Sequence, residues 1–294
     1  MKDPSQIDTP PFAILLMLFS MLCIAVADAI GKHLTQDYSI WQVLWVRSWV
    51  WLAFALAWIS RHGGLRAALR SERPLLQTVR SLLLVAEVSV FILAFRSLPL
   101  GDVTAIASAA PLIVLVLAVL FLGEKIGWHR WTSVALGFVG MMMVARPGVS
   151  VFGWLTLIPL LGVLLWGVYQ VLVRAVSRYD SAETTLLWTG VAMFAVTGLI
   201  APWHWQNPPD MATWGWFFLV GLFNTLGHFG LIAAMQRAQA SALQPFSYSM
   251  VVWALMLGWL AFDEWPDSWT VGGILAIVLA GLYAMHRERR QTHR

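Results

Sequence analysis

Long apolar runs separated by short polar segments dominate this chain. Ten runs approach the roughly 20 apolar residues that a membrane-crossing helix needs. They cover about residues 12–31, 40–59, 75–96, 102–122, 128–145, 152–174, 183–200, 214–236, 241–262 and 268–286. Since backbone groups in hydrocarbon must bond within their own segment, we expect each run to be an α-helix. The pattern predicts an all-α membrane protein with ten transmembrane helices. Its short loops leave one transmembrane domain over residues 1–294.

The composition agrees with lipid as the solvent of this chain. Hydrophobic residues make up 59% and charged residues 12% of the sequence, whereas a soluble domain has about 25% charged residues. The first run, residues 12–31, is longer than the apolar part of a signal peptide, so we interpret it as an uncleaved helix. The only cysteine, Cys23, excludes an intrachain disulfide.

Lysine and arginine are unevenly shared between the two sets of loops. If the N-terminus is cytoplasmic, fourteen of them fall in inner segments and only Lys32, Arg96 and Arg146 in outer loops. Cytoplasmic loops of membrane proteins carry such an excess. We therefore expect a multi-pass protein of the bacterial inner membrane with both termini in the cytoplasm. The net charge of +4 follows from the same bias, so no nucleic-acid partner is needed to explain it.

A weak internal repeat links the two halves of the chain. Shifting the sequence by 140 residues aligns Glu124 with Glu264 and Ala94 with Ala234, and each glutamate follows a long apolar run. The halves are about residues 12–145 and 152–286, with five runs each. An odd number of crossings starts the second half on the opposite side of the membrane, which predicts two inverted repeats with a substrate site between them.

The two glutamates themselves have a plain structural interpretation. Each stands between the end of one helix and the start of the next, where a carboxylate accepts the free N–H groups of the following helix. We expect Glu124 and Glu264 to cap those following helices. The alternative is a role in gating or in relaying ions.

Two stretches of the chain carry a family resemblance. They contain Ala94-Phe-Arg-Ser-Leu-Pro-Leu100, Leu122-Gly-Glu124, Arg146-Pro-Gly148, Ala234-Met-Gln-Arg-Ala238 and Pro245-Phe-Ser-Tyr248. In order and spacing these motifs resemble the EamA-type family of the drug/metabolite transporter superfamily, over nearly the whole chain. The resemblance implies a ten-helix carrier of small metabolites in a bacterial inner membrane, with the YddG-type amino-acid exporters as the branch of first choice.

Ionisable residues inside a membrane are costly, so they should face the interior of the bundle and have partners. Arg47 and Glu87 both lie roughly 10–13 Å from the outer ends of their helices. We expect the two side chains to approach each other, with Ser108 of the next helix nearby. One interpretation is an ion pair that only stabilises the fold. The other is that these residues bind charged groups of a substrate, or a proton.

A second group of polar and aromatic residues comes from the other half. Trp166, His228 and Tyr248 all fall roughly 10 Å from the inner surface, and Asn224 lies one helical turn from His228. A mostly apolar cavity with a few polar groups is typical of a small-molecule site, and these four residues are candidates to line it. Plain helix packing also accounts for them. His228 titrates near neutral pH in water, so proton coupling through it is an open hypothesis beside that of a hydrogen-bonded histidine.

Asp28 and Lys32 stand four residues apart in the first helix, and we expect them to form a local ion pair. No catalytic residue, metal ligand or cofactor motif stands out. The chain has no HExxH, GxSxG or phosphate-binding loop, which argues against an enzyme. Too few polar residues follow the helices for the continuous polar pore of a channel.

These observations lead to one leading function and one alternative of the same class. The leading hypothesis is a secondary transporter that exports amino acids or related metabolites by alternating access. The alternative is an importer of another small solute, such as a nucleoside-like cofactor. The expected partners are a small-molecule substrate and the lipid bilayer. The sequence leaves the direction of transport and the oligomeric state open.

Overall fold

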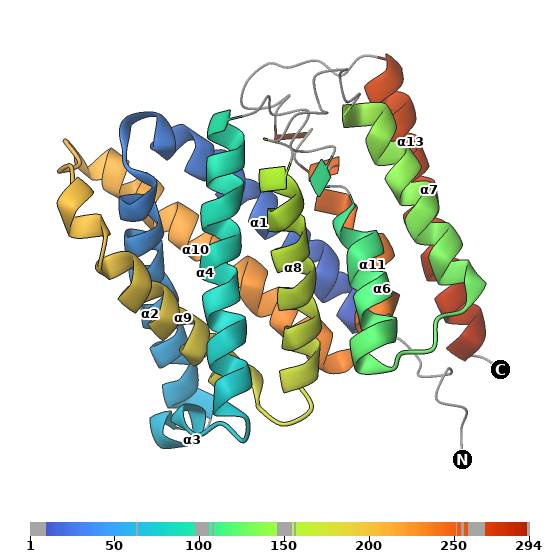
Figure 1. The fold of residues 1–294 in the computed structure, drawn as a ribbon, viewed down its shortest axis with the longest axis horizontal. Helices are drawn as coiled ribbons and strands as arrows, with labels where there is room; N and C mark the ends of the chain where they lie inside the picture. Colours follow the sequence, from blue (N-terminus) through green and yellow to red (C-terminus); the bar gives the residue numbers. More distant parts are fainter. Residues whose placement is uncertain are drawn as a thin grey trace.

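We analysed a computed structural model of the chain (Figure 1). It describes residues 10–62, 64–97, 106–107, 109–145, 155, 157–250, 252–253, 256–257 and 268–292. Every regular element in these ranges is helical, which confirms the all-α prediction. The prediction for Glu264 lies outside the described residues, as does that for Ser108.

The described helices fall on the apolar runs, but α6 and α11 are much shorter than the runs that predict them. In chain order the elements are α1 (Pro11–Asp37), α2 (Ile40–His62), α3 (Leu65–Leu69), α4 (Pro74–Ser97), α6 (Ala110–Leu122), α7 (Trp128–Ala145), α8 (Leu157–Val176), α9 (Ala182–Gly198), the 3₁₀-helix η3 (Ala201–His204), α10 (Met211–Arg237), α11 (Ala240–Ser247) and α13 (Ser268–Thr292). Helices overlap all ten predicted runs, and only the short α3 and η3 were not expected. Within the described residues, five helices (α1, α2, α4, α8 and α10) are long and apolar enough to cross a membrane, and shorter apolar helices accompany them.

Local sequence signals set several helix ends. The Ser181 hydroxyl accepts the N–H of Thr184 and starts α9, and Asp210 does the same for α10 through the N–H of Thr213. At the end of α6, Gly123 adopts a left-handed conformation with φ of 64°. Glycine takes this conformation at no steric cost, so the chain turns sharply out of the helix there.

The helices pair across the two halves of the chain. α1 packs mainly against α10, α2 against α9, α4 against α8, α6 against α8 and α11, and α7 against α13. Figure 1 shows α7 and α13 side by side along one edge of the bundle. In each pair one helix precedes residue 146 and the other follows residue 152. The halves are therefore interleaved and do not form two separate bundles.

We name the two ends of the bundle by the course of the chain. The terminus side is the end at which α1 begins and α13 approaches its last residue (Figure 1). Two contacts join elements there: Arg237 at the end of α10 lies over the ring of Phe12, and His129 bonds Tyr283. The far side is the opposite end, where η3 and the connection from α1 to α2 lie.

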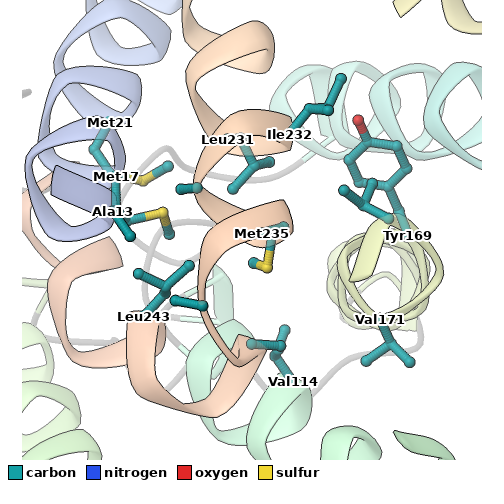
Figure 2. Packing of buried hydrophobic residues seen from close by; sticks show 14 of the residues in the cluster. Ala13, Met17, Met21, Val114, Tyr169, Val171, Leu231, Ile232, Met235 and Leu243 are labelled. Atoms are coloured by element: carbon teal, nitrogen blue, oxygen red, sulfur yellow. The ribbon is translucent and has the colours of Figure 1, made fainter. Parts of the chain in front are cut away.

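The largest apolar core lies where both halves meet. Figure 2 shows Met17 and Met21 of α1 facing Leu231 and Met235 of α10, with Leu243 of α11 beside them. All of these side chains are buried. Small residues let the backbones approach: a Cβ at Gly227 of α10 would stand 2.7 Å from Ile24 of α1. Close approach of small residues is a common basis of helix packing in membranes.

Candidate functional site

Three ionisable side chains from α1, α2 and α4 share the interior of the bundle. Arg47 and Glu87 are 7% and 8% exposed, and their charges interact, as do those of Arg47 and Asp28. None of the three makes a hydrogen bond or direct ion pair with another described residue, and Nε of Arg47 is buried without a partner. The structure thus brings Arg47 and Glu87 into electrostatic range, as the sequence predicts, and adds Asp28.

Asp28 was expected to pair with Lys32, whose side chain lies outside the described ones. The structure places Asp28 on the same face of α1 as Met17 and Met21, both buried. The apolar residues exposed on the opposite face, Phe12 and Leu15, mark the side that faces lipid. Asp28 is nevertheless exposed. Asp28 therefore lies on the face of α1 turned away from Phe12 and Leu15.

A layer of aromatic rings surrounds His228. The ring centroid of Trp51 from α2 lies 5.4 Å from that of His228, and Trp166 of α8 lies edge-on to it at 6.1 Å. Trp166 also stacks on Tyr169 at 5.4 Å, and the Tyr169 hydroxyl lies 3.4 Å from Nδ1 of His228. Two predicted residues, Trp166 and His228, therefore meet. Trp51 and Tyr169 complete the layer.

Arg80 of α4 lies beneath this layer and was missed by the sequence reasoning. Its guanidinium lies over the Tyr169 ring and donates hydrogen bonds to the Thr185 carbonyl and the Thr189 hydroxyl of α9. Its Nε donates to Gln77, which in turn donates to Asp180. The available signal was an arginine six residues inside an apolar helix. Such a residue must face the interior.

The remaining predicted residues fall in different places. Asn224 of α10 is buried, and its Oδ1 has no partner among the described residues. Tyr248 is not part of the aromatic layer. It packs instead with Leu115 of α6 and Val134 of α7, next to Gly137. The second predicted group is therefore divided between two regions of the bundle.

Glu124 joins the halves on the terminus side. Its carboxylate accepts hydrogen bonds from the N–H groups of Ala240 and Ser241, at 3.1 and 3.0 Å, and from the Ser241 hydroxyl at 2.5 Å. These groups begin α11, so the prediction that Glu124 caps the following helix, α7, is wrong. The left-handed turn at Gly123 directs the carboxylate into the bundle and not along the chain.

A second carboxylate links the halves from the other one: Asp180 belongs to the second half and bonds residues of the first. Asp180, between α8 and α9, accepts the N–H of Glu72 and the Ser71 hydroxyl, just before α4, and the side-chain amide of Gln77 in the first turn of α4. On the far side, one of the links between the halves is neutral: Gln42 of α2 exchanges two hydrogen bonds with the backbone of Gln206. Charge-assisted bonds are about twice as strong as neutral ones. The links of Glu124 and Asp180 on the terminus side are therefore stronger than the link between Gln42 and Gln206 on the far side.

This architecture defines a membrane protein whose interior holds polar groups from both halves. A family model described as the EamA-like transporter family matches residues 11–146 and again residues 153–285. The chain belongs to that family. Its members are transporters, so the expectation that the protein is not an enzyme is confirmed.

Curated relatives of similar length bear several transporter names. A riboflavin transporter of Rhizobium johnstonii is 29% identical, with 82% of this chain and 79% of that protein covered. An S-adenosylmethionine uptake transporter of Rickettsia felis is 24% identical, with 94% and 93% covered. A pseudopaline exporter of Pseudomonas aeruginosa is 24% identical, with 91% and 93% covered.

A solved crystal structure has the same fold. It superimposes with a TM-score of 0.80 over 95% of this chain and 98% of its own, at 17% sequence identity. Together the matches establish a multi-pass membrane transporter of small solutes.

Proposed function

We propose that the protein is a secondary transporter that works by alternating access between two inverted five-helix halves, residues 12–145 and 152–286. Two facts support the division of the chain into two related halves. The same family model matches each of them. The helix pairs are also consistent with a two-fold axis between the halves. α1, which opens the first half, packs against α10 of the second, and α8, which opens the second half, packs against α4 of the first.

The substrate site in this proposal lies between the halves, at the aromatic layer around His228. The observation that carries it is the convergence of rings and unpartnered polar atoms from helices of both halves. Buried polar groups in proteins almost always have a hydrogen-bond partner. Oδ1 of Asn224 and Nε of Arg47 have none among the described residues, and a bound solute would supply one. Glu87 and Trp166 complete the set.

Two substrate classes fit this site, each through a separate observation. Stacked rings of Trp166 and Tyr169 favour a solute with a planar ring system. The names of relatives agree with this class, since they include riboflavin and S-adenosylmethionine transporters. Opposite charges at Arg47 and Glu87 favour the second class, amino acids or their derivatives. One relative is named an exporter, so both directions of transport occur among similar proteins.

The proposed orientation places the terminus side in the cytoplasm of a bacterial inner membrane. The exposed arginines Arg61, Arg66, Arg70 and Arg73 lie on that side, around α3, in agreement with the positive-inside rule. The carboxylate links of Glu124 and Asp180 would then close the cytoplasmic entrance. Inward opening requires both to break.

Counterflow in proteoliposomes tests this function. Vesicles are loaded in turn with riboflavin, S-adenosylmethionine and an amino-acid panel, and entry of the labelled solute is followed with and without a pH gradient. We expect exchange of at least one solute. Asn224→Ala should raise its half-saturation concentration about tenfold, because one hydrogen bond to the solute is lost. The control is Thr225→Ala, since the Thr225 hydroxyl bonds only the Gly221 carbonyl of its own helix. If no solute of the panel exchanges through folded protein, these substrate classes are wrong.

A further inference from the structure

A short segment between α2 and α4 lies at the membrane surface. The helical stretches Ile40–Arg61 and Pro74–Phe91 are long and apolar enough to cross the membrane, and only α3 and its flanks separate them. Figure 1 shows α3 at the terminus-side end of the bundle. Because both neighbours enter the hydrocarbon, the connection between them lies at the level of the lipid headgroups. We call residues 61–73 the α3 segment.

α3 has one buried side and two exposed ones. Ala68 is 3% exposed and belongs to an apolar core cluster. Leu65 and Leu69 stand four residues apart and so share a face, and they are 46% and 53% exposed. Arg66 and Arg70, on the neighbouring face, are exposed as well. Exposed leucines beside exposed arginines are typical of a helix that lies in the membrane interface.

The arginines of the α3 segment differ in their bonding from others on the terminus side. Four of those others donate hydrogen bonds to groups of this chain: Arg130, Arg174, Arg178 and Arg237. Three in the α3 segment make no hydrogen bond with any residue that the structure describes: Arg61, Arg66 and Arg70. With Arg73 and Glu72, the segment has four arginines and one glutamate, and thus a net charge of +3. Basic segments next to a membrane attract anionic headgroups.

A cavity of about 370 Å³ lies beside α3, between the α3 segment and the start of α9. Two carboxylates of its wall already have partners, since Asp180 accepts three hydrogen bonds and Glu183 accepts the indole N–H of Trp58. Arg70 and Glu72 also line the cavity, and their charged groups bond no described residue. An open guanidinium and an open carboxylate match a ligand that has a phosphate and hydroxyl donors.

We propose that the α3 segment binds the headgroup of an anionic phospholipid, with phosphatidylglycerol as the best fit. Arg66 and Arg70 bind the phosphate, the glycerol hydroxyls enter the cavity, and Leu65 and Leu69 contact the upper part of the acyl chains. The net charge of +3 decides against a zwitterionic headgroup. The proposal goes beyond the proposed function and does not depend on solute transport.

Native mass spectrometry measures this binding directly. Purified protein in detergent micelles is titrated with phosphatidylglycerol, phosphatidylethanolamine or phosphatidylcholine of the same chain length. We expect the first phosphatidylglycerol to bind at least about tenfold more tightly than the other two. Each arginine near a membrane surface contributes about a factor of five. Arg66→Gln and Arg70→Gln should therefore each weaken phosphatidylglycerol binding about fivefold, and together about 25-fold.

Two variants and one soluble probe are the controls. Arg178→Gln removes the same charge from an exposed arginine on the same side but outside the α3 segment, and it should leave the affinity unchanged. Arg66→Lys keeps the charge and should keep most of the affinity. Glycerol phosphate is the free headgroup, and it should bind far more weakly than the lipid because it has no acyl chain for Leu65 and Leu69 to contact.

The thermal unfolding temperature in nanodiscs is a second measure. Phosphatidylglycerol in place of phosphatidylcholine should raise it for the wild type, since a ligand of the folded state stabilises that state. It should not raise it for the double variant with both Arg66→Gln and Arg70→Gln. In phosphatidylcholine alone the two proteins should unfold at the same temperature, because both side chains are exposed. This comparison separates lost binding from a lost fold.

Three results would overturn the lipid site. Phosphatidylglycerol that binds no more tightly than phosphatidylcholine, or equal binding of phosphatidylethanolamine, contradicts an anionic headgroup. An equal loss of affinity in Arg178→Gln means that diffuse surface charge, and not the α3 segment, attracts the lipid. Glycerol phosphate with the affinity of the lipid assigns the site to a free phosphate. Solute counterflow, the test of the proposed function, is decided separately from all of these.

Discussion

Replacing Glu124 by glutamine should open the terminus side of the protein. The Glu124 carboxylate is buried, 6% exposed, and accepts three hydrogen bonds from the first two residues of α11. It also places a negative charge at the N-terminal end of that helix, where the helix dipole stabilises it. Glutamine has the same size but only one acceptor oxygen and no charge.

The size of the effect follows from these contacts. A hydrogen bond to a charged group contributes about 1.5–3 kcal/mol. The amide oxygen of glutamine can still accept some of the three hydrogen bonds, so we take the free energy lost as that of about one charge-assisted hydrogen bond. Since 1.4 kcal/mol corresponds to a factor of ten, the equilibrium between closed and open forms should shift about 10- to 100-fold toward open.

Reactivity of a buried cysteine measures this shift. Gln244 is fully buried one turn inside α11, where its side chain bonds the Ala240 carbonyl. Gln244→Cys in a Cys23→Ser background gives a single reactive thiol. Its rate of labelling by an impermeant maleimide, applied from the terminus side, should rise about 10- to 100-fold with Glu124→Gln. Glu72→Gln, which changes an exposed carboxylate on the same side, should leave the rate unchanged.

The reasoning is refuted if the labelling rate of folded Glu124→Gln protein stays within about twofold of the parent, since the loss of one charge-assisted hydrogen bond corresponds to a change of at least about tenfold. A double-mutant cycle adds a second criterion. Ser241→Ala should have a smaller effect alone, and the two changes together should be less than additive because they remove the same contact.

Three further outcomes are expected. Lysine in place of Arg80 should lower the free energy of unfolding by about 1–3 kcal/mol, because a point charge cannot make the bonds of the guanidinium fork; chemical denaturation measures it. Gly140→Ala should destabilise by a similar amount of about 1–3 kcal/mol, since its Cβ would lie 2.8 Å from the Gly273 carbonyl oxygen, whereas the Cβ of Gly281→Ala would meet nothing within 4 Å; the thermal unfolding temperatures of the two variants measure the difference. Hydrogen bonds from Thr213 hold the pKa of Asp210 below its usual value, so its cap stabilises the protein above about pH 3.9 and is lost as the pH falls through the lowered pKa. The wild type should lose more of its unfolding temperature between pH 7 and pH 3 than Asp210→Ala, which has no cap to lose. An equal loss in both proteins would contradict this expectation.

Hydrophobic length was enough to locate the helices, because a membrane-crossing run has to be long and continuous. It also indicated that Arg47 and Glu87 lie inside the bundle, and both side chains are buried. Contacts between side chains of different helices do not follow from hydrophobic length. Asp28 has a near neighbour in sequence, Lys32, yet its charge interacts with Arg47 on another helix, and this depends on helix rotation and on which helices are adjacent.

The same limit explains the results for Glu124 and Tyr248. A single-helix argument assigns Glu124 to the next helix in the chain, but the turn at Gly123 directs it to the other half. Tyr248 was expected near Trp166 and His228 from its depth alone, whereas in the structure it packs with Leu115 and Val134. Arg80 could have been found, because an arginine within an apolar run has to face the interior whichever helices surround it.

The interleaved helix pairs have a consequence for how the protein is made. When residue 145 leaves the ribosome, α1, α2, α4, α6 and α7 have all been synthesised, but the main partner of each lies later in the chain. The first half must therefore wait in the bilayer with its polar interior faces unmatched. Contacts between distant segments also slow folding, because the intervening chain has to be ordered first. Biogenesis should finish only with the arrival of α13, and two separately expressed halves should assemble together while neither is stable alone.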